Sequence, residues 1–131
     1  KVFEGFQRNS SLTVTASASG NGIRIAGLAA GHDKARCMGE YTRQAGLKGG
    51  KAWYKGGYRG ECAVWYHAST GDWLVGSTTN IGTTTCGISA SSTAPTPDAV
   101  QAGTWRVTLP WQPNSEVRSV SPDTALGLLM A

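Results

Sequence analysis

The sequence predicts an all-β fold: a single antiparallel sandwich or small barrel of about seven or eight short strands, with little helix. Segments of alternating apolar and polar or β-branched residues recur about every ten residues, a spacing typical of such folds. Glycine occupies 18 of the 131 positions and supplies turn signals between these segments. A chain of this length is enough for one domain but not for two independent cores.

The strands predicted in the first half of the chain are short and end near glycine. Residues 11–16 alternate apolar with hydroxyl side chains, as a half-buried strand does. A Ser-Gly-Asn-Gly turn at 19–22 precedes a second strand at 23–27. Two further strands are expected at 37–42 and 52–55.

The second half contains the clearest hairpin. Residues 62–67 form the strongest predicted strand, and the Ser-Thr-Gly turn at 69–71 leads into its partner at 72–76. A β-branched run at 83–89 and the segment 103–109 complete the predicted strands. Pro110 ends the last of them.

Helical character is confined to residues 28–36 and 98–102, each long enough for only one or two turns. The predicted organisation is therefore an N-terminal extension with a first strand at 1–22, a β-rich core module at 23–109 and a C-terminal tail at 110–131.

Three tryptophans lie in predicted strands and are expected to share one aromatic core: Trp65, Trp73 and Trp105. Each large buried ring contributes on the order of 2–3 kcal/mol, which a small glycine-rich domain needs. Trp111 lies between two prolines and is the tryptophan expected to face a partner or ligand.

The chain has three cysteines, so at least one thiol has no intramolecular partner. A disulfide is expected between Cys62 and Cys86, which would close a loop worth roughly 3 kcal/mol and leave Cys37 unpaired. No spacing rule excludes pairing with Cys37, and three reduced thiols are the other alternative. The cysteines form no C-x-x-C pair, so no metal site is expected.

Seven of the twelve basic residues lie between positions 34 and 59, where Glu40 is the only acidic residue. Aromatic residues are interleaved with them, a combination that binds glycans or other anionic partners. The alternative is an ordinary solvated basic surface. The candidate ligand or partner face consists of Tyr41, Lys51, Trp53, Tyr54, Tyr58, Arg59 and Trp111.

No catalytic site is expected. His32 and His67 are the only histidines, and neither has a nucleophile at a recognisable spacing. The strand-associated acids do not form the carboxylate pair that a glycosidase needs. The sequence therefore predicts a protein that is not an enzyme and uses no cofactor.

The net charge of +4 is too low to predict nucleic-acid binding, and no apolar run approaches the ~20 residues of a membrane span. The Ser, Thr and Gly richness and the Asn9-Ser10-Ser11 sequon favour an extracellular or otherwise exported protein, with Asn9 as the glycosylation site.

The middle of the chain resembles a small Gly/Trp-rich β module that recurs in uncharacterised proteins of algae and other unicellular eukaryotes. The resemblance covers roughly residues 23–108 and implies a compact β module found in interaction or repeat contexts, without any known reaction. Its elements are GEY at 39–41, GKAWY at 50–54, VWY at 64–66, GDWLVG at 71–76 and GTWRV at 103–107.

The predicted function is that of a non-catalytic, exported structural or assembly subunit. Its partners are expected to be other protein chains, including copies of itself, which it would contact through sheet edges. The alternative is a carbohydrate-binding module that uses exposed Trp and Tyr side chains beside the basic face.

Overall fold

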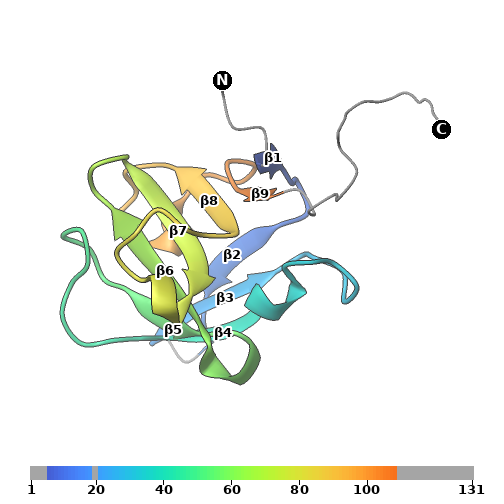
Figure 1. The fold of residues 1–131 in the computed structure, drawn as a ribbon, viewed down its shortest axis with the longest axis horizontal. Helices are drawn as coiled ribbons and strands as arrows, with labels where there is room; N and C mark the ends of the chain where they lie inside the picture. Colours follow the sequence, from blue (N-terminus) through green and yellow to red (C-terminus); the bar gives the residue numbers. More distant parts are fainter. Residues whose placement is uncertain (1–5, 19–20, 109–131) are drawn as a thin grey trace.

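The structure is a computed structural model that describes residues 6–18 and 21–108. Within these residues the protein is all-β, as predicted: nine strands form one antiparallel sheet curled into a half-barrel, with four 3-10 turns and no α-helix (Figure 1). The prediction of seven or eight strands was too low, because the short first strand has no alternating pattern of its own. None of the described helical turns is long and apolar enough to cross a membrane.

The strands from β2 to β9 follow one another as an antiparallel meander, and β1 returns to pair with β9. The sheet order is β1-β9-β8-β7-β6-β5-β4-β3-β2. The bounds are β1 (Phe6–Arg8), β2 (Thr13–Ala16), β3 (Gly22–Ala26), β4 (Gly39–Arg43), β5 (Tyr54–Gly56), β6 (Cys62–His67), β7 (Asp72–Ser77), β8 (Ile88–Ser91) and β9 (Arg106–Thr108).

The connection between β1 and β2 explains why the sheet curls. These two strands form opposite edges of the sheet, yet only residues 9–12 join them. The edges of a flat nine-stranded sheet would lie about 38 Å apart, whereas the link from Arg8 to Thr13 spans at most about 18 Å. The N-terminal segment therefore holds the two edges of the curled sheet near each other.

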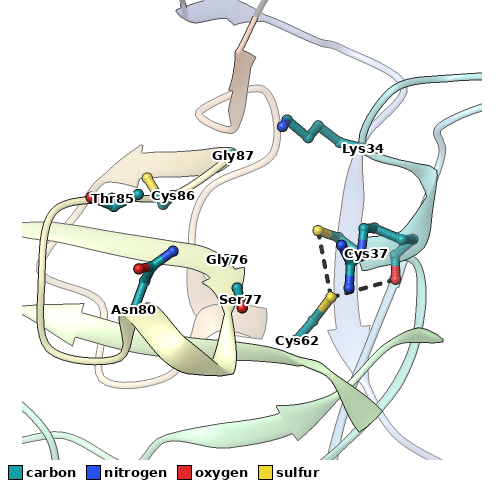
Figure 2. A pocket seen from close by; sticks show the side chains of 10 residues that line it. Lys34, Cys37, Cys62, Gly76, Ser77, Asn80, Thr85, Cys86 and Gly87 are labelled. Atoms are coloured by element: carbon teal, nitrogen blue, oxygen red, sulfur yellow. Dashed lines mark hydrogen bonds between the residues drawn. The ribbon is translucent and has the colours of Figure 1, made fainter. Parts of the chain in front are cut away.

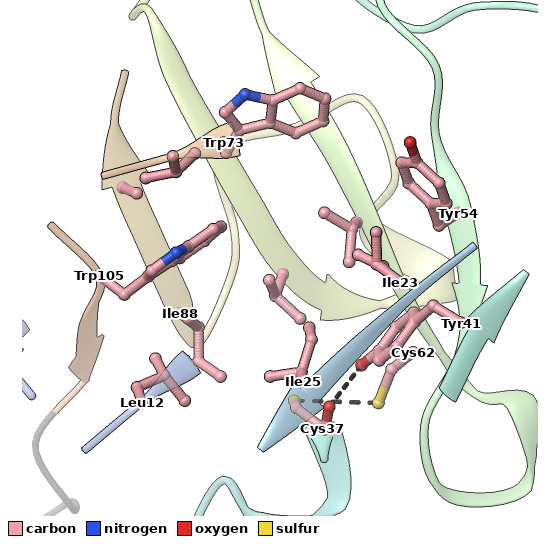
Figure 3. Packing of buried hydrophobic residues seen from close by; sticks show 14 of the residues in the cluster. Leu12, Ile23, Ile25, Cys37, Tyr41, Tyr54, Cys62, Trp73, Ile88 and Trp105 are labelled. Atoms are coloured by element: carbon pink, nitrogen blue, oxygen red, sulfur yellow. Dashed lines mark hydrogen bonds between the residues drawn. The ribbon is translucent and has the colours of Figure 1, made fainter. Parts of the chain in front are cut away.

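The inner face of the sheet carries the main core, which includes Trp73 and Trp105. Figure 3 shows these two rings toward one end of the core, whereas Cys37, Tyr41 and Cys62 gather at another. The other buried members are Leu12, Ile23, Ile25, Ala52, Tyr54, Val64, Tyr66, Val75, Ile88, Ala90, Val100 and Val107.

Trp65 does not belong to this core. It is buried with Ala63 and Leu74 in a second cluster, against which Ile81 and Cys86 pack. The hairpin register pairs Trp65 with Leu74 and so places it on the outer face of the sheet. The expectation of one aromatic core shared by three tryptophans is thus wrong for Trp65, although all three are buried.

Strand β8 begins later than the sequence predicted. The Thr83 hydroxyl donates to the Asn80 carbonyl oxygen at 2.7 Å and accepts from the Thr85 amide at 3.1 Å. Such local side-chain bonds compete with sheet formation, so the β-branched run at 83–87 is a loop. Cys86 consequently lies before β8 and not within a strand.

Four short 3-10 turns lie between the strands of the described chain: η1 (Ala35–Cys37), η2 (Tyr58–Gly60), η3 (Thr78–Asn80) and η4 (Pro97–Ala99). Two of them lie where helical turns were expected. Cys37 belongs to η1 and precedes β4, so the prediction of a strand that begins at Cys37 is wrong for this residue.

Candidate functional site

The residues of the predicted ligand face do not lie together in the structure. Tyr41 and Tyr54 are 1% and 4% exposed, respectively, and both belong to the inner core. The register explains their orientation, because Tyr41 lies opposite the buried Ile23 and Tyr54 lies opposite the buried Val64. These two tyrosines therefore do not line a binding surface.

Lys51 and Trp53 lie in the loop between β4 and β5, where both make internal contacts. The Lys51 ammonium lies 4.7 Å from the centre of the Tyr66 ring and donates to the Thr93 carbonyl oxygen at 3.1 Å. The Trp53 indole donates to the Ala45 carbonyl oxygen at 2.9 Å, and the Lys48 ammonium lies 5.2 Å from its ring centre. The Lys51 contacts tie the loop to strand β6 and to the segment after β8, whereas those of Trp53 lie within the loop.

Tyr58 and Arg59 belong to a different loop, between β5 and β6. Tyr58 is 55% exposed, and the Arg59 guanidinium lies 5.1 Å from the centre of its ring. Trp111, the remaining member of the predicted face, lies outside the described residues. The predicted face therefore separates into buried residues, a folded-back loop and an exposed Tyr-Arg pair.

The remaining polar candidates have local partners. Asn9 is half-buried, and its Oδ1 accepts from the Ser11 amide at 3.0 Å and from the Ser11 hydroxyl at 2.6 Å. Glycosylation at Asn9 stays a prediction. The His67 ring bonds the Thr70 hydroxyl at 3.1 Å, and the His32 ring accepts from the Lys34 amide at 2.9 Å.

One surface pocket brings all three cysteines together (Figure 2). It has a volume of about 200 Å³, and Lys34 and Arg36 also line it. The Cys62 Sγ lies 3.9 Å from the Cys37 Sγ and 3.6 Å from the Arg36 carbonyl oxygen. All three thiols are free, so the disulfide expected between Cys62 and Cys86 is not formed in this structure. Figure 2 shows Cys86 on the opposite wall, because its loop folds along the outer face of the sheet.

Cys37 and Cys62 alter each other's ionisation. The hydrogen bond between the two thiols lowers the pKa of Cys62 from 9.0 to about 6. Burial opposes this shift, while the Arg36 charge reinforces it. The same hydrogen bond, together with burial, raises the pKa of Cys37. Cys62 is therefore the more nucleophilic thiol of the pair near neutral pH.

The third thiol and a neighbouring phenol behave differently. Burial, followed by the Asp72 charge, raises the pKa of Cys86 to about 11. Burial also raises the pKa of Tyr41, whose hydroxyl donates to the Cys37 carbonyl oxygen at 2.7 Å. Of the His, Cys, Asp and Glu residues that the structure describes, no group of three is placed to hold a metal ion.

Nothing in the sequence favours a contact between Cys37 and Cys62 over the other cysteine pairs. Cys37 and Cys62 belong to separate elements, η1 and β6, and 24 residues lie between them. Only the packing of η1 against the start of β6 brings the two sulfurs together. No sequence motif marks this contact.

A second candidate site lies at the β2 edge of the sheet. Strand β2 pairs with β3, and no other described strand pairs with its opposite side. A cavity of about 330 Å³ lies between β2 and the segment that runs from η4 to β9. Its apolar lining includes Leu12, Val14, Val100 and Trp105.

The comparisons with known proteins find no match among protein-family models, curated proteins or solved structures. The resemblance to a Gly/Trp-rich β module stays a prediction.

Proposed function

We propose that the protein is a small open barrel that acts as a non-catalytic assembly subunit and pairs with a second copy of itself through strand β2. The observation that carries this proposal is the edge of β2, which pairs with no second strand among the described residues and lies beside an apolar cavity. Strand addition at such an edge takes its affinity from main-chain hydrogen bonds and its specificity from neighbouring side-chain pockets.

The hydrogen-bond pattern identifies the groups at this edge. The Ser17 amide donates to the Gly22 carbonyl oxygen at 2.9 Å, next to the register pairs of β2 and β3. Hydrogen-bonded pairs alternate along an antiparallel ladder, so Thr13 and Thr15 also bond to β3. The amide and carbonyl groups of Val14 and Ala16 therefore point away from β3.

These groups suit a twofold contact. Suppose that two copies of β2 run antiparallel, with Thr15 of one opposite Thr15 of the other. Val14 of each copy then lies opposite Ala16 of the other copy. Each of these pairs can then exchange two main-chain hydrogen bonds. The same surface serves both copies, as a twofold interface requires.

The side chains of β2 do not protect its edge. Its sequence, Thr-Val-Thr-Ala, contains neither a charged residue nor a proline. Monomeric β proteins commonly use charges, prolines or bulges to prevent edge pairing. The side chains of Thr13, Thr15 and Ala16 are exposed, and η4 contacts this strand beside the neighbouring cavity.

Sedimentation and light scattering across protein concentration test the proposal, extended to about 1 mM because a contact this small binds weakly. The wild-type chain should dimerise. Thr15→Lys should make it monomeric, since two like charges would face each other across the twofold axis. The matched control Thr42→Lys places the same charge at an exposed position of the internal strand β4 and should still dimerise. A wild-type chain that remains monomeric throughout would overturn the proposal.

Export remains part of this proposal on the strength of composition and the Asn9 sequon. The carbohydrate-binding alternative has less support, because Tyr41 and Tyr54 are buried and Lys51 and Trp53 make internal contacts.

A further inference from the structure

Cys37 and Cys62 are arranged as a pair of thiols that face each other. Their sulfur atoms lie 3.9 Å apart, and Figure 2 shows both side chains directed toward the same point. A disulfide requires about 2.0 Å between the sulfurs. Cys37 ends η1 and Cys62 begins β6, so each thiol lies at an element end.

Access to the pair is limited to small molecules. Cys37 is 4% and Cys62 1% exposed, but both line the pocket of about 200 Å³. This volume holds several molecules the size of water, each of which occupies about 30 Å³ in the liquid. Hydrogen peroxide is only slightly larger than water and fits this pocket.

We propose that Cys37 and Cys62 form a redox-active pair that hydrogen peroxide oxidises to an intramolecular disulfide, with Cys62 as the attacking thiol and Cys37 as the resolving thiol. This inference is independent of the assembly proposed for β2, which involves neither residue.

The reaction consists of two balanced steps. In the first, the Cys62 thiolate attacks one peroxide oxygen; the sulfur–oxygen bond forms, the oxygen–oxygen bond breaks, and the departing hydroxide takes up the proton that Cys62 released. In the second, the Cys37 sulfur attacks the resulting Cys62 sulfenic acid, and hydroxide leaves with the Cys37 proton as a second water. Two thiols lose two electrons in total, and one peroxide is reduced to two waters.

The electrostatics of the pocket support this assignment of roles. The hydrogen bond with Cys37 lowers the pKa of Cys62 to about 6, so Cys62 gives up its proton to form the attacking thiolate more readily than Cys37 does. Cys86 lines the same pocket, but burial raises its pKa to about 11, and it stays protonated. Cys86 is therefore an internal control, because it lines the same pocket but is not expected to react with peroxide.

Peptide mapping of the full chain tests the proposal. The reduced protein is treated with one equivalent of hydrogen peroxide, then denatured and alkylated without reductant. Trypsin alone leaves Cys62 and Cys86 together in the peptide 60–106, so a second cleavage after the aromatic residues between them is required. We expect Cys37 linked to Cys62 and Cys86 alkylated. A disulfide that contains Cys86, or three alkylated thiols, would overturn the proposal.

Three variants distinguish the attacking thiol from the resolving thiol. The peptide mapping of the wild-type chain tests the proposal even if one of these variants folds poorly. Cys37→Ser should stop at the Cys62 sulfenic acid, which a dimedone adduct reports. Cys62→Ser should give neither this adduct nor a disulfide. Cys86→Ser should form the disulfide at the wild-type rate; a tenfold loss of rate in this control would contradict the assigned roles.

Discussion

Trp65 and Trp73 lie on the two strands of one hairpin, yet their side chains leave the sheet on opposite faces. The register places Trp65 opposite Leu74 and Trp73 opposite Tyr66. The Trp65 indole donates to the Thr83 carbonyl oxygen at 3.1 Å, and the Trp73 indole donates to the Ala94 carbonyl oxygen at 2.9 Å. Each tryptophan thus anchors a different loop to its own face of the sheet.

Replacing either indole with a phenyl ring should release only the loop that it holds. Trp65→Phe and Trp73→Phe each lose one indole hydrogen bond and some buried surface, and each should destabilise the fold by about 1–3 kcal/mol. Hydrogen exchange distinguishes them. Trp65→Phe should accelerate exchange at Thr83 and Thr85 but not at Ala94, and Trp73→Phe should do the opposite. Equal acceleration of both loops in both variants would contradict separate anchoring.

Gly27 determines how the segment between β1 and β2 crosses the end of β3. Its φ is +119°, and a Cβ at this position would collide with the Ser11 carbonyl group. Gly27→Ala should therefore destabilise the fold by about 2–3 kcal/mol or more in chemical denaturation. Gly31→Ala is the matched control, because no atom lies within 4 Å of its added Cβ. A loss of stability in Gly27→Ala no greater than in Gly31→Ala would show that the crossing is not constrained.

The Tyr41 hydroxyl contributes a buried hydrogen bond. It donates to the Cys37 carbonyl oxygen at 2.7 Å, and Tyr41 is only 1% exposed. Tyr41→Phe should lower the free energy of unfolding by about 1–3 kcal/mol, because this carbonyl oxygen loses its partner. Tyr58→Phe, at a residue that is 55% exposed, should change it by less than about 0.5 kcal/mol. Equal effects in urea denaturation would be evidence against a stabilising role for the buried hydroxyl.

Stability should fall as the pH rises above about 9. In the folded protein the pKa of Cys86 is raised from 9.0 to about 11, and that of Tyr41 is raised above its ordinary 10.0. The folded state therefore holds more protons than the unfolded state over this range, so the free energy of unfolding decreases with pH. Cys62 acts in the opposite sense: its pKa is lowered to about 6, so its contribution is complete above 9.0 and is lost as the pH falls through 6.

Denaturation under reducing conditions at pH 7, 9 and 11 measures this dependence. Cys86→Ser should reduce the decline between pH 9 and 11, because it removes one of the groups that stay protonated only in the folded state. A free energy of unfolding that stays constant over this interval would show that the thiols and phenols ionise as readily in the folded protein as in the unfolded chain, and one that rises would show that they ionise more readily when folded.

The local sequence pattern was sufficient to predict much of the fold. Alternation and turn residues correctly predicted strands at β2, β3, β6 and β7, and the Ser-Thr-Gly turn correctly predicted the hairpin between the last two. These features depend on neighbours in the chain, where side-chain direction alternates with a period of two and glycine permits the turn. The strand at 83–89 was misplaced for a local reason too, since the Thr83 hydroxyl bonds competed with β pairing.

The sequence by itself determined the all-β class, the hairpin and the fact that Trp65 and Trp73 are buried. Only the tertiary structure decided which face each tryptophan occupies, that Tyr41 and Tyr54 lie in the core, and that Cys37 meets Cys62. Alternation divides a strand into two faces but does not say which face the curled sheet encloses. That choice, and every contact between distant segments, depends on the strand order and on the short link that brings the sheet's two edges together.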